Sequence, residues 1–430
     1  MGGVPGISAA AEAPDPEGML MDDRLTSARI GKVADATPFQ LLYDFYRLSG
    51  YQRRRHEAGV LDFTFGDPHD PPSQAYVEIL REALVPEHEL WFAYNTGDAK
   101  AIEAATESLR RHLGIPFETD DVYLTTGGFT AISTALKIVG DPGDEVVYSL
   151  PPWFLYEPLV LEAGLVPVKV SIDRETFDLD LDAIAAAITP RTRIVIVNSP
   201  NNPTGRIYPP ATLERLAALL DDASERNGRR IFLISDEPYN RIVFDGARFR
   251  SPVEFYPWSF LAYSYGKTLL SPGERIGYLA LPPAMPGREQ FRAAIEAAQI
   301  AGGWLFPNAS MQYALPRLEA LGFDIELFQR KRDVMVTALR EMGYRVAVPE
   351  GTFYLFPESP LADDVEFARM LDREGVLVLP GAMFETPGFF RISLTATLQT
   401  IEQSLPRFAA AFRAAGAATA AHDAGAAAAR

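Results

Sequence analysis

Lys267 follows an apolar stretch, FLAYSY, and is expected in a short loop of small residues. The chain has only six lysines among its 40 basic residues, so arginine supplies most of the positive charge and each lysine is informative. A primary amine forms a Schiff base with an aldehyde, which a guanidinium cannot do, when its surroundings lower the pKa of the amine. Taken alone, Lys267 is also consistent with an ordinary solvated loop lysine.

The tripeptide Gly266-Lys267-Thr268 looks like the end of a Walker A loop. That loop requires a further glycine five residues before the second one, and Leu261 occupies that position. Because the glycine-rich cradle for phosphates is absent, binding of a nucleoside triphosphate is not expected.

Three features of the sequence have the chemistry to bind a phosphate group. Arg275 lies eight residues after Lys267 and can grip a phosphate through two hydrogen bonds, and Ser264 offers a hydroxyl. Gly127-Gly128-Phe129 opens a predicted helix, whose first backbone N–H groups form an anion site. The alternatives are a surface ion pair between Arg275 and Glu274 and a tight turn that uses glycine for steric reasons.

A second set of residues suits an aromatic ring and a carboxylate. Asp236 ends a buried apolar strand, where a carboxylate is costly unless it is paired, and a protonated pyridine nitrogen is such a partner. Tyr239 and Asn202 can hydrogen-bond a phenolic oxygen, and Trp153 can stack on the ring. Arg391, in PGFFRISLT, suits a substrate α-carboxylate. A turn cap, a core tryptophan and a strand-edge arginine are the corresponding structural alternatives.

These residues follow a series of apolar segments that alternate with helical patterns. The expected strands are Asp121–Thr125, Glu145–Leu150, Thr192–Asn198, Arg230–Ser235, Phe260–Tyr265 and Ile276–Leu281. One of the helices between them is Pro210–Asn227, which has a leucine stripe. The alternation predicts an α/β fold with a mostly parallel, helix-flanked sheet. Ligands of such sheets lie outside the carboxyl ends of the strands, where the residues named above are found.

The C-terminal part has a different pattern, which predicts a smaller α+β domain. Helices are expected at Phe323–Glu341 and Asp364–Glu374, with strands at Arg345–Val348, Thr352–Phe356, Leu377–Leu379 and Phe390–Leu394. We divide the chain into a flexible N-terminal arm (1–29), the N-terminal part of the small domain (30–70), a large cofactor-binding domain (71–320), the C-terminal part of the small domain (321–413) and a disordered alanine-rich tail (414–430).

Composition excludes several classes of function. A net charge of −17 has the wrong sign for binding nucleic acid. There is no cysteine, so disulfides, thiolate nucleophiles and cysteine metal sites are absent, and no metal site is expected. No apolar run reaches the roughly 18 residues of a membrane span, and the first residues do not read as a signal peptide. We therefore expect a cytoplasmic protein.

Several motifs together resemble those of a known family. They are NSPNNPTG at 198–205, DEPY at 236–239, SYGKTLLSPGERIG at 264–277, and PGAMF at 380–384 with FRIS at 390–393. From about Ile30 to Phe412 the chain resembles fold-type I enzymes that depend on pyridoxal 5′-phosphate (PLP), the class I and II aminotransferases of the aspartate aminotransferase superfamily. The resemblance implies a large PLP-binding domain and a small domain built from both termini.

The resemblance also implies roles around the cofactor. Lys267 holds PLP as a Schiff base and shuttles the proton, and Asp236 pairs with the pyridine nitrogen. Asn202 and Tyr239 are expected to hold the phenolic oxygen, and Trp153 to stack on the ring. The phosphate is expected to bind Gly128, Phe129, Ser264 and Arg275. One departure is Gly266, where many relatives have serine or threonine before the lysine.

For the substrate and the assembly, the resemblance implies that Arg391, Asn202 and the Gly66 backbone bind the α-carboxylate. Tyr94 would reach the phosphate of a neighbouring subunit, which implies a homodimer with shared active sites. Cis peptide bonds are expected before Pro151 and Pro203.

The expected reaction is a ping-pong transfer of an amino group between an L-amino acid and a 2-oxo acid. The alternatives on the same fold are a C–S β-lyase, a synthase or a PLP-dependent oxidase, and a binding protein without activity is a further one. The specificity face is expected from 30–39, 66–72 and the second subunit's 304–308, with Phe39, His69 and Trp304 as contacts. These aromatics favour an apolar or aromatic amino acid, and a dicarboxylic one stays open.

Overall fold

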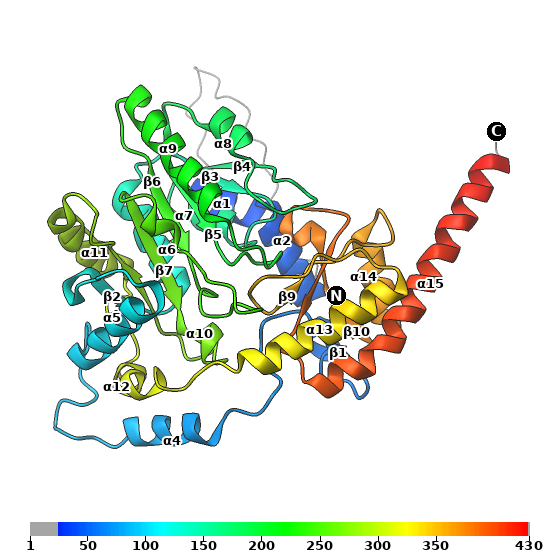
Figure 1. Cartoon of the computed structure of the whole chain (residues 1–430), viewed down its shortest axis with the longest axis horizontal. Coiled ribbons are helices and arrows are strands. Elements are labelled where there is room, and N and C mark those ends of the chain that lie inside the picture. The colour runs from blue at the N-terminus through cyan, green and yellow to red at the C-terminus, as the bar shows by residue number, and fades with distance from the viewer. Residues whose placement is uncertain (1–24, 429–430) are drawn as a thin grey trace.

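A computed structural model describes residues 25–428 and has one large sheet flanked by helices (Figure 1). The seven-stranded sheet has the order β2-β8-β7-β6-β5-β3-β4, and its strands are parallel except β8, which runs antiparallel to β2 and β7. The strands are β2 (Val122–Thr125), β3 (Glu145–Ser149), β4 (Val166–Val170), β5 (Thr192–Asn198), β6 (Phe232–Asp236), β7 (Ser259–Ser264) and β8 (Gly277–Ala280). The predicted α/β class with a mostly parallel sheet is confirmed.

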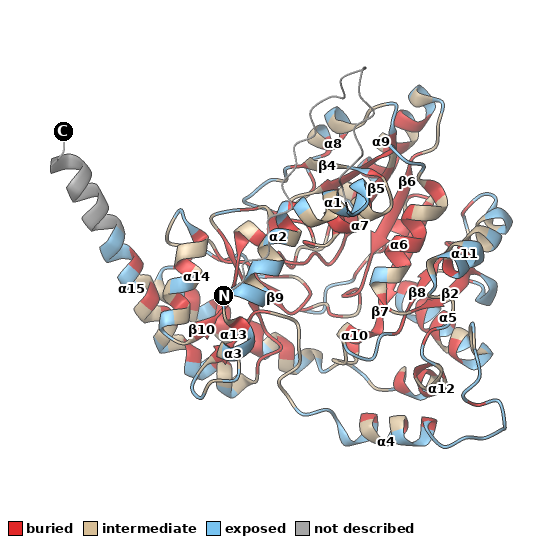
Figure 2. Ribbon diagram, turned by 180° about the vertical axis from the view of Figure 1, so that it is seen from behind, coloured by how far each residue is buried: buried red, intermediate tan, exposed pale blue. Residues whose placement is uncertain are grey.

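Helices cover both faces of this sheet. On one face lie α6 (Gly128–Val139), α7 (Tyr156–Glu162) and α11 (Arg288–Gly302). On the other lie α5 (Ala99–Leu113), α8 (Leu181–Ala187), α9 (Pro210–Asn227) and α12 (Ala309–Leu318), with α4 (Gln74–Ala83) packed on α12. The central strands β5, β6 and β7 are buried along nearly their whole length, and Figure 2 shows this buried interior between exposed outer helix surfaces. Residues on both faces are therefore apolar, as expected for parallel strands.

A smaller unit combines the two ends of the described chain. Its helices are α13 (Ile325–Met342), α14 (Asp364–Arg373) and α15 (Leu398–Ala428), and its short strands are β1 (Leu61–Asp62), β9 (Tyr354–Leu355), β10 (Val376–Leu377), β11 (Leu379–Pro380) and β12 (Phe390–Ser393). β1 pairs in parallel with β10, and β12 lies between β11 and β9. Leu61 and Phe63 share a core with Phe328, Phe390 and Phe408, so the segment before residue 70 packs with the C-terminal region.

The N-terminal helices lie between the two units. They are α1 (Ala28–Asp35), α2 (Thr37–Tyr43), the π-helix η1 (Asp44–Leu48) and α3 (Tyr51–Arg54). α1 packs against α7 of the large sheet, whereas α2 contacts both α7 and the 3₁₀ helix η4 (Gly381–Phe384). The segment assigned to the small domain from residue 30 therefore begins in a helix that also contacts the large sheet.

Some local predictions differ from the structure. Arg345–Val348 forms no strand because no neighbouring strand pairs with it, and β4 was not predicted. Lys267 lies on the short helix α10 (Tyr265–Thr268) and not in a loop. The expected disordered tail continues α15 as far as Ala428, since alanine is the strongest helix former. Most of the expected flexible arm, residues 1–24, lies outside the described residues.

Two short helices complete the elements, η2 (Thr119–Asp121) and η3 (Pro252–Glu254). Across residues 25–428, no helix is both long and apolar enough to cross a membrane. Cis peptide bonds precede Pro151 and Pro203, which confirms both predictions, and a third precedes Pro200.

Candidate active site

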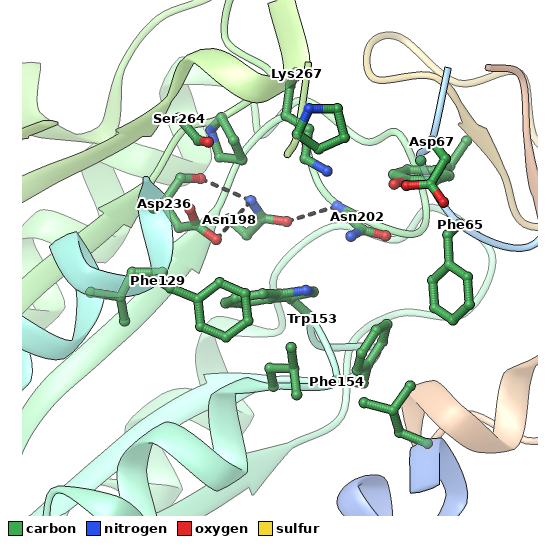
Figure 3. A pocket seen from close by; sticks show the side chains of 18 of the residues that line it. Phe65, Asp67, Phe129, Trp153, Phe154, Asn198, Asn202, Asp236, Ser264 and Lys267 are labelled. Carbon is green, nitrogen blue, oxygen red and sulfur yellow. Dashed lines mark hydrogen bonds between the residues drawn. The ribbon is translucent and has the colours of Figure 1, made fainter. Parts of the chain in front are cut away.

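A cavity of about 560 Å³ lies at the carboxyl ends of the central strands. The last residues of β5, β6 and β7 are Asn198, Asp236 and Ser264, and all three line the cavity. The structure brings together eleven of the twelve predicted site residues there: Gly66, Gly128, Phe129, Trp153, Asn202, Asp236, Tyr239, Ser264, Lys267, Arg275 and Arg391. In Figure 3, Lys267 reaches in from the side opposite Trp153, and Phe65 and Phe154 lie at the end away from Asp236 and Phe129.

Lys267 enters the cavity directly after strand β7. Its Nζ lies 5.9 Å from the ring centroids of both Tyr239 and Phe353, so the amine is held beside aromatic surface. Within the described chain no carboxylate forms a salt bridge with it. An amine placed in this way is open to a reactive carbonyl, whereas a structural lysine such as Lys331 is paired, here to Asp70 at 2.6 Å.

The glycine before this lysine has a steric explanation. A Cβ added to Gly266 would lie 2.9 Å from the Cα of Pro272, closer than side chains normally approach backbone. The chain returns over α10 at that point, where the Ser271 N–H donates to the Gly266 carbonyl at 3.1 Å. Gly266 is therefore required by this tight return.

Asp236 is a buried carboxylate without a cation at hydrogen-bonding distance in residues 25–428. Its side chain accepts a hydrogen bond from the Tyr156 hydroxyl and a long one, 3.4 Å, from Asn198 Nδ2. Burial raises the pKa of Asp236 to about 7, while the Tyr156 hydrogen bond and the charge of Lys267 oppose this shift. The site thus has an unpaired acid that a cationic ligand group would hold in the ionised form.

A second part of the cavity is suited to an anion. Gly127 has φ +94° and precedes α6, and a Cβ there would lie 2.5 Å from Nη2 of Arg275. Ser264 lies against Gly128, where an added Cβ would be 3.6 Å from the serine Cβ. Arg275 donates to the Pro272 carbonyl at 2.9 Å and forms no ion pair with Glu274 among the described contacts. A guanidinium that lacks a carboxylate partner and lies at a helix N-terminus favours phosphate.

Arg391 is the clearest indication that this cavity accepts an anionic group. Its side chain is 2% exposed and donates to Asn202 Oδ1 at 3.0 Å and to the Thr64 carbonyl at 2.7 Å. Nε has no partner, no carboxylate pairs with this arginine in residues 25–428, and burial lowers the pKa of Arg391. Because a buried guanidinium without a counter-ion is costly, the arrangement points to an anionic ligand group.

Trp153 and Tyr239 supply aromatic surface. The Trp153 ring meets Phe129 edge-on at 4.6 Å between centroids and Tyr156 at 5.5 Å. Tyr239 is buried, which raises the pKa of its hydroxyl well above the usual value. The Asn198 side chain joins Asp236 to the backbone of Asn202, as the dashed lines in Figure 3 show. The ring-facing residues are therefore held by neighbours and not left to rotate freely.

The remaining predicted contacts lie elsewhere in this chain. Tyr94 is 89% exposed and packs against Phe306 with the ring centroids 4.8 Å apart. Trp304 rests on α6, where its Nε1 donates to Thr134 at 3.3 Å, and His69 does not line the cavity. Phe39 does line it.

Sequence reasoning missed several residues of the site. Tyr156, Asn198 and Tyr354 were not predicted, although Tyr156 lies three residues after Trp153, in the turn that leads into α7, where its N–H donates to the Trp153 carbonyl at 3.0 Å. The carbonyl of Thr64 was also missed, because backbone groups carry no sequence signal.

Comparisons with known proteins agree with this geometry. Residues 58–408 match the family model described as aminotransferase class I and II. The aspartate/prephenate aminotransferase of Thermus thermophilus is 33% identical over 368 residues, which cover 83% of this chain and 92% of that protein. The aspartate/prephenate aminotransferase of Cereibacter sphaeroides is 32% identical over 71% of this chain and 80% of that protein.

Two solved structures are also similar. An amino transferase from Eubacterium rectale superposes with a TM-score of 0.81 and 30% identity, covering 91% of this chain and 99% of that one. The Thermus thermophilus aspartate aminotransferase with maleate superposes with a TM-score of 0.77 and 29% identity, covering 90% and 100%.

Proposed function

The chain belongs to the class I and II aminotransferase family and is an aminotransferase, and on that premise we propose that Lys267 holds PLP in the cavity described above. The proposed substrates are an L-amino acid and a 2-oxo acid, used in turn by a ping-pong mechanism. One observation carries the proposal. Asp236, Arg275 and Arg391 are ionisable groups of one cavity that have no ion-pair partner in the described chain, as a cofactor and a carboxylate substrate require.

The residues present fit the cofactor. Lys267 Nζ would carry it as a Schiff base, and Asp236 would face its ring nitrogen. Arg275, Ser264 and the start of α6 at Gly128–Phe129 would bind its phosphate. The phenolic oxygen and ring face are assigned to Asn202, Tyr239 and Trp153.

When bound, PLP supplies an aldehyde that takes up the amino group and a ring that withdraws electrons from the substrate Cα. The protein does the rest. Arg391 orients the substrate by its α-carboxylate, with Asn202 beside it and the Gly66 backbone close by. The substrate amine would displace Lys267 from the aldehyde, and the freed Nζ would accept the proton that leaves Cα and later deliver it again, which is general acid–base catalysis. The Asp236 carboxylate would stabilise a positive charge on the cofactor's ring nitrogen, at the end of the cavity away from Phe65 and Phe154.

The variant Lys267→Ala tests this proposal, with Lys331→Ala as a control at the lysine paired to Asp70. We expect Lys267→Ala to bind PLP without the Schiff-base absorbance and to form no 2-oxo acid, because Arg275 still binds the phosphate while the amine is lost. Lys331→Ala should keep the absorbance. Unchanged turnover in Lys267→Ala would refute the proposal, and so would release of ammonia instead of its transfer to the oxo acid.

We also propose a homodimer in which Tyr94 serves the neighbouring active site. Its support is a set of exposed apolar residues in the segments 84–94 and 300–306, which meet where Tyr94 packs on Phe306, and soluble monomers rarely leave large apolar patches uncovered. They are Leu84, Val85, Leu90, Phe92, Tyr94, Ile300 and Phe306. The mass of the protein in solution measures the assembly. Mixing Lys267→Ala with Tyr94→Phe subunits should recover activity if sites are shared, since one hybrid site then has both residues, and a failure to recover any would contradict sharing. A cytoplasmic location stays a prediction from the sequence.

A further inference from the structure

We propose that the amino acid accepted at this site is monocarboxylic and has a large apolar side chain of aromatic size. The inference rests on the proposed function, because it assigns Lys267, Arg275 and Arg391 to the cofactor and the α-carboxylate. It goes further by identifying which substrate side chain the rest of the cavity fits. The relatives described above are named for aspartate and prephenate. The inference therefore predicts that this chain prefers a different substrate from aspartate, whose side chain is acidic.

The charges of the cavity are the first support. Its charged lining residues in the described chain are Arg47, Asp67, Asp236, Lys267, Arg275 and Arg391. Four of these are assigned to the cofactor and to the α-carboxylate, which leaves Asp67 and Arg47. Asp67 is negative and would repel a second carboxylate, although Arg55 lies 3.3 Å from it and reduces its field. Arg47 is exposed, on η1, and is the one lining cation left over.

The walls at the substrate end are the second support. In Figure 3, Phe65 and Phe154 stand at the end of the cavity away from Asp236 and Ser264, which is where the side chain of a bound substrate would extend. α2 and η1 add a roof over the cavity. The apolar and aromatic residues of these walls and this roof are Phe39, Leu42, Tyr43, Tyr46, Phe65, Phe154 and Leu155.

These walls are held by packing that spans both units of the fold. Phe154 meets Phe384 edge-on at 5.6 Å, and Phe65 meets Tyr46 edge-on at 5.8 Å between ring centroids. Leu42 and Phe65 pack against the same buried cluster that contains Phe154 and Phe384. The surface is therefore preformed in this chain, and most of it consists of aromatic and aliphatic side chains.

The energetic consequence follows from desolvation. An apolar side chain gains free energy in proportion to the area it removes from water, whereas a carboxylate among these rings loses its hydration without a buried cation in return. We expect the ratio of kcat/KM for L-phenylalanine over L-aspartate to be at least about 100-fold, which corresponds to about 2.7 kcal/mol.

The first measurement uses calorimetry to determine the dissociation constants of two carboxylates for the PLP-loaded protein. Both carboxylates lack an amino group and so cannot react. 3-Phenylpropanoate should bind at least about 100-fold more tightly than maleate. This readout does not depend on turnover. Tighter binding of maleate would overturn the inference, as would a higher kcat/KM for L-aspartate than for L-phenylalanine. If neither amino acid reacts and PLP is bound, the proposed function fails, and the binding ratio still decides the substrate class.

Variants at the rim sharpen the test. Tyr43 is 42% exposed, so Tyr43→Arg and its uncharged control Tyr43→Gln are expected to fold. Tyr43→Arg adds a cation to the roof. It should lower the ratio of 3-phenylpropanoate affinity to maleate affinity by about tenfold more than Tyr43→Gln does. Equal effects of the two would overturn the assignment of the roof as the side-chain contact. Arg47→Ala should leave maleate binding unchanged, and a loss of maleate binding there would show that Arg47 receives a second carboxylate, against the inference.

Discussion

Asp236 gives the apoprotein a pH dependence that can be calculated from its surroundings. Burial raises its pKa to about 7, against an ordinary value of 3.8. In the unfolded chain the carboxyl is ionised above about pH 4, whereas in the folded chain it keeps its proton up to about pH 7. Between these values the folded state binds more protons than the unfolded state, so stability falls as the pH rises.

The size of the effect follows from the same shift. Each pH unit between the two pKa values costs about 1.4 kcal/mol, so the apoprotein should lose about 3 kcal/mol through Asp236 between pH 5 and pH 7. Asp236→Asn removes this loss and keeps an oxygen to accept the Tyr156 hydrogen bond. The pKa of the adjacent Glu237 is also raised to about 7 by burial, and its contribution cancels because it is present in both proteins.

The assay is urea unfolding of both apoproteins from pH 5 to pH 8, followed by tryptophan fluorescence. The free energy of unfolding of Asp236→Asn minus that of the wild type should rise by about 3 kcal/mol from pH 5 to pH 7 and then level off. PLP should reduce the rise, because a cation beside Asp236 holds the carboxylate ionised at little cost. A difference that is the same at pH 5 and pH 8 would refute the assignment of a raised pKa to Asp236.

Three further changes test the packing that positions the site. Glu319→Ala leaves the largely buried Arg241 guanidinium, which lies 2.9 Å from the Glu319 carboxylate, without its partner. Urea unfolding should show a loss of about 3–5 kcal/mol, and a loss below about 1 kcal/mol, as for an exposed ion pair, would contradict this. Gly266→Ala places a Cβ against Pro272 and should lower both the free energy of PLP binding and the free energy of unfolding by about 1–3 kcal/mol. Fluorescence titration measures the first and urea unfolding the second. An unchanged PLP affinity would mean that the backbone return over α10 adjusts freely. Leu279→Ala opens a cavity in the fully buried sheet and should cost about 2–5 kcal/mol by urea unfolding, whereas a cost near zero would mean that the neighbours collapse into the space.

The residues of the candidate site were predictable where strand ends position them. Asp236 and Ser264 end β6 and β7, and neighbouring parallel strands carry such residues to one edge of the sheet whatever the intervening loops do. Motif spacing predicted Lys267 and Arg275 as site residues, and both line the cavity. These predictions depend on local patterns, which the sequence displays directly.

Other residues depend on contacts between distant segments. Tyr156 lies 80 residues before Asp236 in the chain, and its hydroxyl reaches the Asp236 carboxylate only because α7 packs on the sheet. Gly266 looked like a departure, and its cause, Pro272 folding back, is visible only in three dimensions. Arg345–Val348 has the composition of a strand and forms none, because a strand exists only with a neighbour to pair with.

The position of the N-terminal helices has an evolutionary consequence. Asp236 ends β6 of the large sheet and Lys267 follows β7, whereas the roof of the cavity comes from α2 and η1, a stretch of about a dozen residues near the start of the chain. Mutations in that stretch change what lies over the substrate without altering β5, β6 or β7. A lineage can therefore drift from one amino acid to another, or be redirected in the laboratory by exchanging this cassette, while the proton-transfer machinery is inherited intact.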